Sequence, residues 1–434
     1  MRIGSKTLSL DPVWSAPPVD EIEEQLLRYA AFPELAAGGS AMRAEFVILD
    51  PSLTAESPAN DDLPARVSKI AARMNLSVVS IGHHSADAHG TGGFPHSIDE
   101  LAAMSDDAYA TAFATLRDRV GWVLASSRFS RRRHIFIPQF DAALVSAVIE
   151  LLAQQPASSR PFVHLATRWD EERMPNIQRI GDLSSVGRAV HQMNSERTTT
   201  FFYAWARPLA QRLAIALGQP VRPLDPPPEL SLASEGEQQG ERLCVGFFGA
   251  ASRARGFHRL PTIIRWANQA ASHPRRLRFV VQHSPDAHEP KDILSTAAAE
   301  LGALPERNVS LIEDALPPKL FYSAIKQVDA VLLPYSTDEY AERISNTALH
   351  AMAAGKLVFT LETARLPGTL KSRVVTARND QELGEIIADF SADLASVRTN
   401  SQVAKATYWA TLRPSRLFAQ LLYGPTVLGT AAAP

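Results

Sequence analysis

The sequence predicts an α/β protein made of two domains, each built around a parallel β-sheet, and three observations lead to this fold class. Short apolar strands alternate with amphipathic helical segments along most of the chain, which is the pattern of parallel βαβ units. A segment rich in Pro, Ser, Gly, Glu and Gln interrupts this alternation at about residues 226–242, and the alternation then starts again. The chain has 434 residues, which is long for one domain and sufficient for two.

The composition is that of an ordinary soluble globular protein. Hydrophobic residues make up 45% and charged residues 21%, and the net charge of -2 gives no basic footprint for broad nucleic-acid binding. The single Cys244 excludes an intrachain disulfide and a multi-cysteine metal site, and fits a reducing compartment. The first residues lack the apolar core of a signal peptide, and no apolar run approaches the roughly 18 residues that span a bilayer. We therefore expect a cytoplasmic protein.

The first half, residues 1–230, is expected to form one Rossmann-like domain. Its apolar runs predict strands at 44–50, 76–82, 134–139, 161–167 and 198–205. Helical periodicity predicts helices at 19–32, 62–75, 98–127, 140–155 and 206–218, with one more helix within the polar residues 170–197. A linker is expected at residues 231–241.

The second half, residues 242–395, repeats the alternation and predicts a second Rossmann-like domain. Its strands are expected at 243–250, 277–282, 308–314, 329–335, 356–360 and 372–377, with helices at 256–272, 291–303, 317–328, 345–355 and 379–394. Residues 396–434 form a tail with a helix expected near 408–424. We expect the two domains to face a ligand cleft and the tail helix to cross back to the first domain.

The stretch Asp329–Thr360 predicts a phosphate-binding unit. A buried strand ends at Pro334 and Tyr335, a polar loop follows, and Ser345 stands where a helix N-cap is expected. Ligands of open α/β sheets bind at the carboxyl edge of the strands, and the exposed amides of a helix N-terminus favour phosphate.

A second candidate lies in the turn GAASRARGF, which follows the first strand of the second half. Gly249 and Ser252 are small enough to let a ligand approach the backbone, and Arg253 and Arg255 offer guanidinium groups that bind phosphate in bidentate fashion before Gly256. The alternative is an ordinary strand-to-helix loop with solvated arginines.

Taken together, these two stretches resemble the donor-binding domain of GT-B glycosyltransferases, in particular the large retaining family 4 group. In that family a strand ends in Gly and is followed by a short turn and Lys-Gly, and here Arg255-Gly256 stands in the Lys-Gly place. The family's second signature is Glu-x7-Glu, and here Glu342 is followed after seven residues by His350 and then AMAAG. The resemblance covers about residues 242–392, and the first half matches only in layout.

The resemblance implies roles for individual residues. Glu342 would contact the donor sugar, and Arg255 would neutralise the leaving diphosphate. Backbone amides around Ser345 and Asn346 would hold that diphosphate, as the helix N-terminus predicts independently. The remaining donor-binding candidates are Gly249, Ser252, Arg253, Gly256, Tyr335 and His350.

The chain departs from the family pattern at two positions. His350 replaces the acid that usually binds the ribose; a neutral imidazole can accept one hydrogen bond and donate another, and the exchange equally fits a different donor or a weakened site. The place of the family's phosphate-binding arginine falls on Ala250, so Arg253 is the nearest substitute.

The loop GHHSADAHGTGG, 82–93, follows a predicted strand and is the candidate acceptor side. Gly92 and Gly93 would allow phosphate approach, and His83, His84 or His89 would bind the acceptor or sugar; a flexible polar loop is the alternative. The histidines lack acidic or cysteine partners at ligand spacing, so we expect no metal site.

The resemblance implies a hexosyltransferase that moves a sugar from a nucleotide-diphosphate donor to a saccharide or lipid-linked acceptor in polysaccharide or glycoconjugate synthesis. The resemblance implies retention of configuration without a metal or other cofactor. Two alternatives remain: a non-catalytic GT-B-like partner protein that binds a nucleotide or glycan, and a nucleotide-sugar epimerase or hydrolase.

An arginine-rich run, residues 126–134, is the strongest local charge feature. Its arginines form either a solvated surface or a peripheral contact with anionic lipid at the inner face of the membrane. They are Arg128, Arg131, Arg132 and Arg133.

Overall fold

The computed structural model describes the two sheets and the helices that pack on them. The described residues are 45–50, 66–67, 69–70, 77–81, 94, 96, 98–125, 133–169, 174–180, 182–224, 226–227, 229–233, 240–285, 291–335, 345–362, 374–411, 417 and 421. They all belong to one compact unit, Arg43–Pro434. The helix expected at 19–32 lies outside them.

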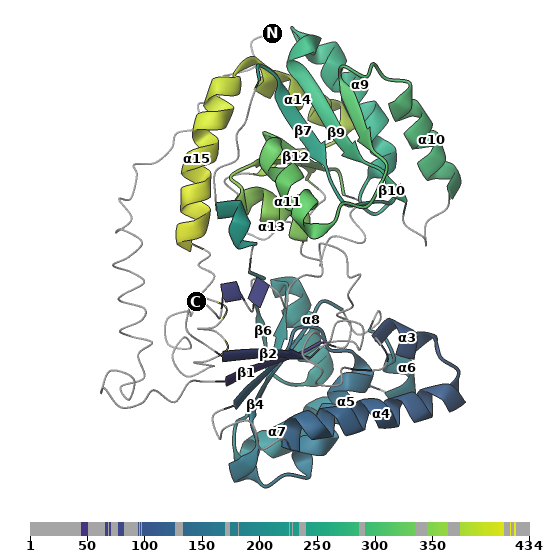
Figure 1. The fold of residues 1–434 in the computed structure, drawn as a ribbon, viewed down its shortest axis with the longest axis vertical. Helices are drawn as coiled ribbons and strands as arrows, with labels where there is room; N and C mark the ends of the chain where they lie inside the picture. Colours follow the sequence, from purple (N-terminus) through teal and green to yellow (C-terminus); the bar gives the residue numbers. More distant parts are fainter. Residues whose placement is uncertain are drawn as a thin grey trace. The chain divides into compact units, whose positions relative to one another are not determined.

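The first sheet has six parallel strands in the order β2-β1-β3-β4-β5-β6. Figure 1 labels β1, β2, β4 and β6 of this sheet. The strands are β1 (Glu45–Leu49), β2 (Ser77–Ile81), β3 (Arg133–Ile137), β4 (Phe162–Thr167), β5 (Thr200–Ala204) and β6 (Val221–Pro223). The first five lie where the sequence predicts strands. The sequence reasoning missed β6, because its Pro-rich surroundings read as an exit loop; proline is tolerated there since β6 is an edge strand.

Apolar side chains cover both faces of this sheet. The helices of this half are α3 (Ile98–Ala103), α4 (Asp106–Ala125), α5 (Ala142–Ala153), α6 (Ile177–Ile180), α7 (Leu183–Glu196) and α8 (Arg207–Leu217). Apolar side chains of α4, α5, α7 and α8 pack on one face in a single buried cluster. On the other face, Val67 and Ile70 pack with Phe46 and Ile48 of β1. Burial on both faces explains why these strands read as continuous apolar runs.

Two helix predictions in this half were wrong in detail. The segment expected as one helix at 98–127 forms α3 and α4, because Ser105 and the acidic pair Asp106 and Asp107 start a new helix. The polar segment expected to hold one helix forms α6 and α7.

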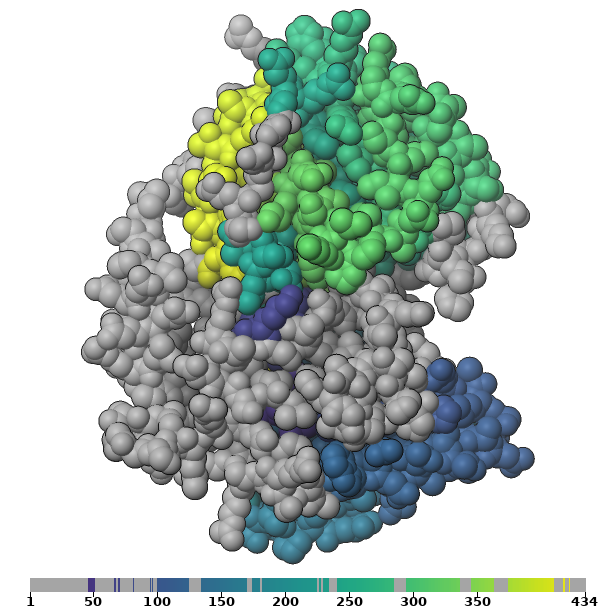
Figure 2. Space-filling model, viewed as in Figure 1, coloured from purple at the N-terminus to yellow at the C-terminus, as the bar shows by residue number. Residues whose placement is uncertain are grey.

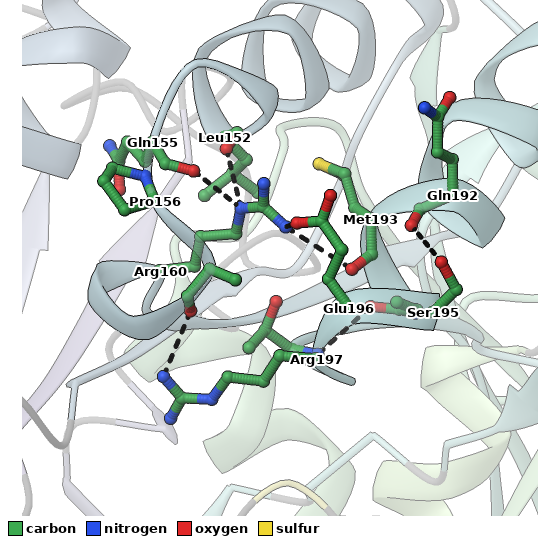
Figure 3. A network of polar contacts seen from close by, with 12 residues as sticks. Leu152, Gln155, Pro156, Arg160, Gln192, Met193, Ser195, Glu196 and Arg197 are labelled. Atoms are coloured by element: carbon green, nitrogen blue, oxygen red, sulfur yellow. Dashed lines mark hydrogen bonds and ion pairs between the residues drawn. The ribbon is translucent and has the colours of Figure 1, made fainter.

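One buried arginine, Arg160, connects the C-terminal ends of α5 and α7 (Figure 3). The Nε of Arg160 donates to the carbonyl oxygens of Leu152 and Gln155 at 3.0 Å each, and its Nη1 donates to that of Met193 at 3.4 Å. Its Nη1 also lies 2.9 Å from a carboxylate oxygen of Glu196. The carbonyls of Leu152 and Met193 also accept from backbone N–H groups, those of Gln155 and Arg197, so Arg160 adds a second, charged donor at the C-terminal ends of both helices.

The second sheet has six parallel strands in the order β11-β9-β7-β12-β13-β14. They are β7 (Leu243–Phe247), β9 (Leu277–Gln282), β11 (Val309–Ile312), β12 (Ala330–Leu333), β13 (Leu357–Leu361) and β14 (Val374–Ala377). A short second pair, β8 (Ala250–Ala251) and β10 (Ser284–Pro285), continues beyond β7 and β9. All six main strands were predicted.

The helices of this half are α9 (Leu260–Ala270), α10 (Lys291–Gly302), α11 (Pro318–Gln327), α13 (Asn346–Ala353), α14 (Asp380–Ala392) and α15 (Leu394–Thr411). Side chains of α9, α10 and α14 pack on one face of the sheet, and those of α11 and α13 on the other. β12 serves both faces, since Ala330 and Leu332 point into the first cluster and Val331 and Leu333 into the second.

The tail leaves the second sheet along α15, whose yellow surface flanks the green helices of that half in Figure 2. The Oγ of Ser401 donates to the carbonyl of Gly355 at 2.6 Å, and the Nε1 of Trp409 donates to that of Ala353 at 2.8 Å. Further on, Leu417 and Leu421 belong to the same buried cluster as Phe46 of the first half. The expected return of the tail to the first half is confirmed. α15 covers Leu394–Thr411, and most of the helix expected near 408–424 lies outside the described residues.

The two Rossmann-like sheets confirm the predicted α/β fold. The domain boundaries at 230, 242 and 395 stay predictions. None of the helices that the structure describes is long and apolar enough to cross a membrane.

Candidate functional site

The strand order of the second sheet indicates where a ligand can bind. From β7 the chain moves to β9 on one side, and β12 joins β7 on the other side. Such a reversal leaves a crevice at the carboxyl ends of the two central strands, and ligands of open α/β sheets bind there. Gly249 follows β7 and Pro334 follows β12, so both predicted motifs lie at this point.

The first part of the candidate site is a kink in the backbone directly after β7. Gly249 has a φ of 117°, which side-chain-bearing residues rarely adopt. Its N–H donates to the Oε1 of the buried Gln282 at 2.9 Å. A Cβ built on Gly249 would lie 1.9 Å from Nη1 of Arg255. The space that a side chain would occupy is therefore filled by the Arg255 guanidinium, which lies over the Gly249 backbone.

The next turn is closed by its own hydrogen bonds. The Oγ of Ser252 accepts from the N–H of Arg255 at 3.2 Å, and the carbonyl of Ser252 accepts from Phe257 at 3.1 Å. Gly256 closes the turn with a φ of 74°, and a Cβ there would lie 1.9 Å from the carbonyl oxygen of Pro334. The turn is thus held directly against the end of β12. Arg253, in the middle of the turn, is exposed.

On the other side of the switch point, α13 presents its N-terminus. Ser345 is the N-cap, as predicted, and its Oγ accepts from the N–H of Ala348 at 3.1 Å. The same Oγ lies 2.6 Å from the hydroxyl of Tyr335, which is buried at the end of β12. The hydroxyl contact ties the helix start to the strand end. The N–H groups at the start of an α-helix have no carbonyl partner within the helix, and such groups favour an anion.

His350 lies farther along α13 and is fully buried. Its ring packs edge-on against Tyr322 and Phe321 of α11, with centroid separations of 5.0 and 6.2 Å. Neither ring nitrogen has a hydrogen-bond partner in the part of the chain that the structure describes. Burial lowers the pKa of His350 well below its ordinary value, and the charge of Arg66 lowers it further. The imidazole is therefore neutral, and its contact with a ribose stays a prediction.

Several predicted site residues lie outside the described residues. They are Glu342, the acceptor-side group His83, His84, His89, Gly92 and Gly93, and the arginines Arg128, Arg131 and Arg132. Arg133 is described as the first residue of β3. Their roles stay predictions, and so does the expected absence of a metal; the described residues hold no cluster of three candidate metal ligands.

The first sheet has a corresponding switch point between β1 and β3. Gln139 follows β3 there; it is buried, and its Nε2 has no hydrogen-bond partner among the described residues. Asp141 starts α5 beside it by accepting from the N–H of Leu144 at 2.8 Å, and burial raises its pKa to about 6. Asn176, with a φ of 61°, donates to Asp141 at 2.6 Å. A buried amide without a partner marks this edge for a polar ligand.

Sequence reasoning missed Gln139 and Gln282. Both read as the ends of apolar strands, and only their position at a carboxyl edge, just after a run of buried residues, could have singled them out.

Comparison with solved structures identifies the fold. A UDP-forming α,α-trehalose-phosphate synthase from Burkholderia xenovorans aligns with a TM-score of 0.60 at 10% identity, over 88% of this chain and 99% of that chain. A trehalose-6-phosphate protein from E. coli bound with UDP-2-fluoro glucose aligns at 0.56 and 8% identity, over 87% and 99%. An α-glucosyltransferase in complex with UDP and a 13-mer DNA aligns at 0.55 and 12% identity, over 88% and 100%.

In sequence, neither a family model nor a curated protein matches the chain. The structural likeness extends over nearly the full length of those three proteins, and it shows that this chain has the GT-B fold that its sequence predicts. Resemblance to family 4 within that fold stays a prediction.

Proposed function

We propose that the protein is a glycosyltransferase that moves a hexose from a UDP-sugar to a saccharide acceptor. The observation that carries this proposal is the meeting of the Arg255-Gly256 turn with the capped start of α13 at one switch point. A guanidinium and a helix N-terminus are both groups with which a protein can bind a diphosphate without a metal.

The chemistry follows from the charge of the leaving group. As the bond between the sugar and the diphosphate breaks, negative charge grows on the diphosphate. Arg255 and the amides at the start of α13, which are fixed before the reaction, stabilise that charge. Arginine remains protonated throughout, so it supplies this charge at any working pH. In this proposal the transfer proceeds with retention, the leaving phosphate takes the acceptor proton, and Glu342 binds the donor sugar.

The solved structures of similar fold support the choice of donor. The synthase from Burkholderia xenovorans is UDP-forming, and the E. coli protein and the α-glucosyltransferase were determined with UDP-2-fluoro glucose and UDP. We extend the uracil nucleotide to this chain as part of the proposal. The DNA in the α-glucosyltransferase complex belongs to that protein.

The acceptor belongs, in this proposal, at the carboxyl edge of the first sheet. Gln139 offers a buried amide donor there that has no partner among the described residues, and sugar hydroxyls accept such bonds. A lipid-linked saccharide would add a membrane contact through the arginine run that ends at Arg133. Polysaccharide or glycoconjugate synthesis is the corresponding role.

One observation favours a second candidate, a protein that binds the nucleotide without catalysis. His350 stands where the family has its second acid, and its imidazole is buried against Phe321 and Tyr322. A site without that carboxylate lacks one anchor for the ribose.

A nucleotide-release assay tests the proposal and separates it from its rivals. The purified protein is incubated with UDP-glucose in the presence of EDTA, with and without a panel of saccharides, and released UDP is measured. We expect release that rises with a suitable acceptor. The absence of any turnover together with tight UDP binding would support the non-catalytic protein. Release that no acceptor changes would support a hydrolase.

A further inference from the structure

We propose that Gln282 is a positioning residue of the donor site, which sets the place of the Arg255 guanidinium through the backbone of Gly249. Gln282 is the last residue of β9 and is buried, with an exposed fraction of 4%. Its side chain joins the ends of three neighbouring strands. The proposal rests on the proposed function, because the guanidinium that it places is the one assigned to the diphosphate.

Two hydrogen bonds fix the orientation of the Gln282 amide. Its Oε1 accepts from the N–H of Gly249 at 2.9 Å, and its Nε2 donates to the carbonyl oxygen of Asp314 at 3.2 Å. One partner is a donor and the other an acceptor, so the amide can lie in only one way. A carboxylate could serve only the first partner and an ammonium only the second. A side-chain amide of this length serves both.

The Gly249 N–H needs this partner. The kink at Gly249 separates β7 from β8, so this amide lies outside the main ladder of the sheet, which ends at Phe247. A buried backbone donor that loses its partner is destabilised by the full loss of its solvation. Gln282 therefore holds the Gly249 peptide in the orientation that its φ of 117° requires.

The Arg255 guanidinium packs against the backbone of the same glycine, Gly249. Nη1 of Arg255 lies where a Cβ of Gly249 would be, 1.9 Å from the ideal position of that atom. A shift or rotation of the Gly249 peptide would therefore move the surface on which Arg255 rests. Misplacement of a charged group by a fraction of an ångström weakens its contact with a phosphate oxygen, because such bonds depend on distance and angle. Gln282 thus acts on the ligand through Arg255, without touching the ligand itself.

The second hydrogen bond of the Gln282 amide reaches the loop after β11. There the backbone of His283 pairs with Ile312 at 2.7 Å, and Gln282 extends the connection to Asp314. The register of β9 against β11 places Gln282 opposite Ile312, so the side chain is already aligned with this loop. The two hydrogen bonds of Gln282 thus connect the turn after β7 to β9 and to the loop after β11, on the side of β7 away from β12.

A double-mutant cycle tests the proposal by measuring the affinity for UDP by calorimetry. The variants are Gln282→Met, Arg255→Met and the two combined, each in full-length protein. We expect Gln282→Met to weaken UDP binding about tenfold. This is the effect of losing one well-placed hydrogen bond between the Arg255 guanidinium and the diphosphate. In the Arg255→Met background the same change should have little further effect, because the residue through which Gln282 acts is gone.

Gln282→Asn provides a second variant that keeps a side-chain amide. It is one methylene shorter, so it cannot span both partners, and its polarity protects the fold if Gln282→Met is unstable. We expect a similar loss of UDP affinity and the same absence of effect without Arg255. A merely structural role would lower the melting temperature and give additive effects in the cycle.

The outcomes separate this proposal from the proposed function. Wild-type protein that binds UDP, with Gln282 variants that bind it equally well, overturns the positioning role and leaves the donor site intact. Additive losses in the cycle also overturn it. Wild-type protein that binds no UDP overturns the donor site and the positioning role together.

Discussion

The Cα of Gly256 lies so close to the carbonyl oxygen of Pro334 that a Cβ on Gly256 would stand 1.9 Å from that oxygen. The glycine belongs to the arginine-bearing turn, and the proline directly follows β12. This contact brings together two parts of the sequence that are almost eighty residues apart. It also makes the site sensitive to a single methyl group.

Gly256→Ala should therefore weaken both the fold and the site. Alanine would have to adopt a φ of 74° and displace the Pro334 carbonyl, which should lower the free energy of unfolding by about 2–3 kcal/mol. The shifted turn should bind UDP at least about tenfold more weakly. Urea unfolding and UDP titration measure the two effects. Gly302→Ala is the control, because a Cβ there meets nothing within 4 Å, and it should change neither quantity appreciably.

Arg160→Met should destabilise the first half without affecting the donor site. The substitution removes the charged donor from the carbonyls of Leu152, Gln155 and Met193. We expect the free energy of unfolding to fall by about 2–4 kcal/mol, as for buried acceptors that lose a charged partner. Glu196→Gln removes only a half-exposed partner and should change stability by less than about 1 kcal/mol. Equal effects of the two substitutions in urea unfolding would contradict this account.

Stability should decrease in mild acid because of two buried imidazoles. The Nδ1 of His134 lies 3.0 Å from the Nε2 of His164, and the rings stack on each other and on Phe46. Burial lowers the pKa of His134 to about 4, and burial together with His134 lowers that of His164 well below its usual range. In the unfolded chain both titrate near pH 6.5.

Between pH 6.5 and 4, the unfolded chain therefore binds protons that the folded protein does not bind, and the free energy of unfolding falls with the pH. His134 alone should contribute about 2 kcal/mol of this loss between pH 7 and pH 5. Urea unfolding at the two pH values, for wild type and a variant with His134→Phe and His164→Phe, measures it. Asp141, whose raised pKa has the opposite effect, is common to both proteins and cancels in the comparison. Identical pH dependence of the two would refute the assignment.

Cys244 should react slowly with thiol reagents. Burial raises its pKa to about 11, so at pH 8 only about one thiol in a thousand is ionised, against roughly a quarter for an ordinary cysteine. Labelling of native protein with a chromogenic disulfide should thus be slow and should become fast in denaturant. Rapid labelling of the native protein at pH 8 would contradict the raised pKa of Cys244.

Most strands could be predicted from the sequence, since each is a short run of apolar residues between turn signals. β6 could not, because Pro223 argues against a strand unless its edge position is known. The break before α4 was readable from Ser105 and the acids that follow it, but the unbroken helical periodicity outweighed it.

The candidate site was predictable to the extent that it depends on local chemistry. Ser345 could be identified as an N-cap because capping depends on neighbouring residues alone. Gln282 could not be identified, since its partners Gly249 and Asp314 are each more than thirty residues away in the sequence. The burial of His350 against α11 is likewise tertiary, and the spacing of the motif does not reveal it.

Calorimetric titration with UDP in the presence of EDTA tests the central claim, a metal-free diphosphate site at the second switch point. We predict that wild type binds UDP and that Arg255→Met binds it about 10 to 100-fold more weakly, as expected for a lost charge-assisted hydrogen bond. Arg275→Met, which changes an exposed arginine just before the amino end of β9, should leave the affinity unchanged. Failure of wild type to bind UDP, or equal affinities for wild type and Arg255→Met, would contradict the account.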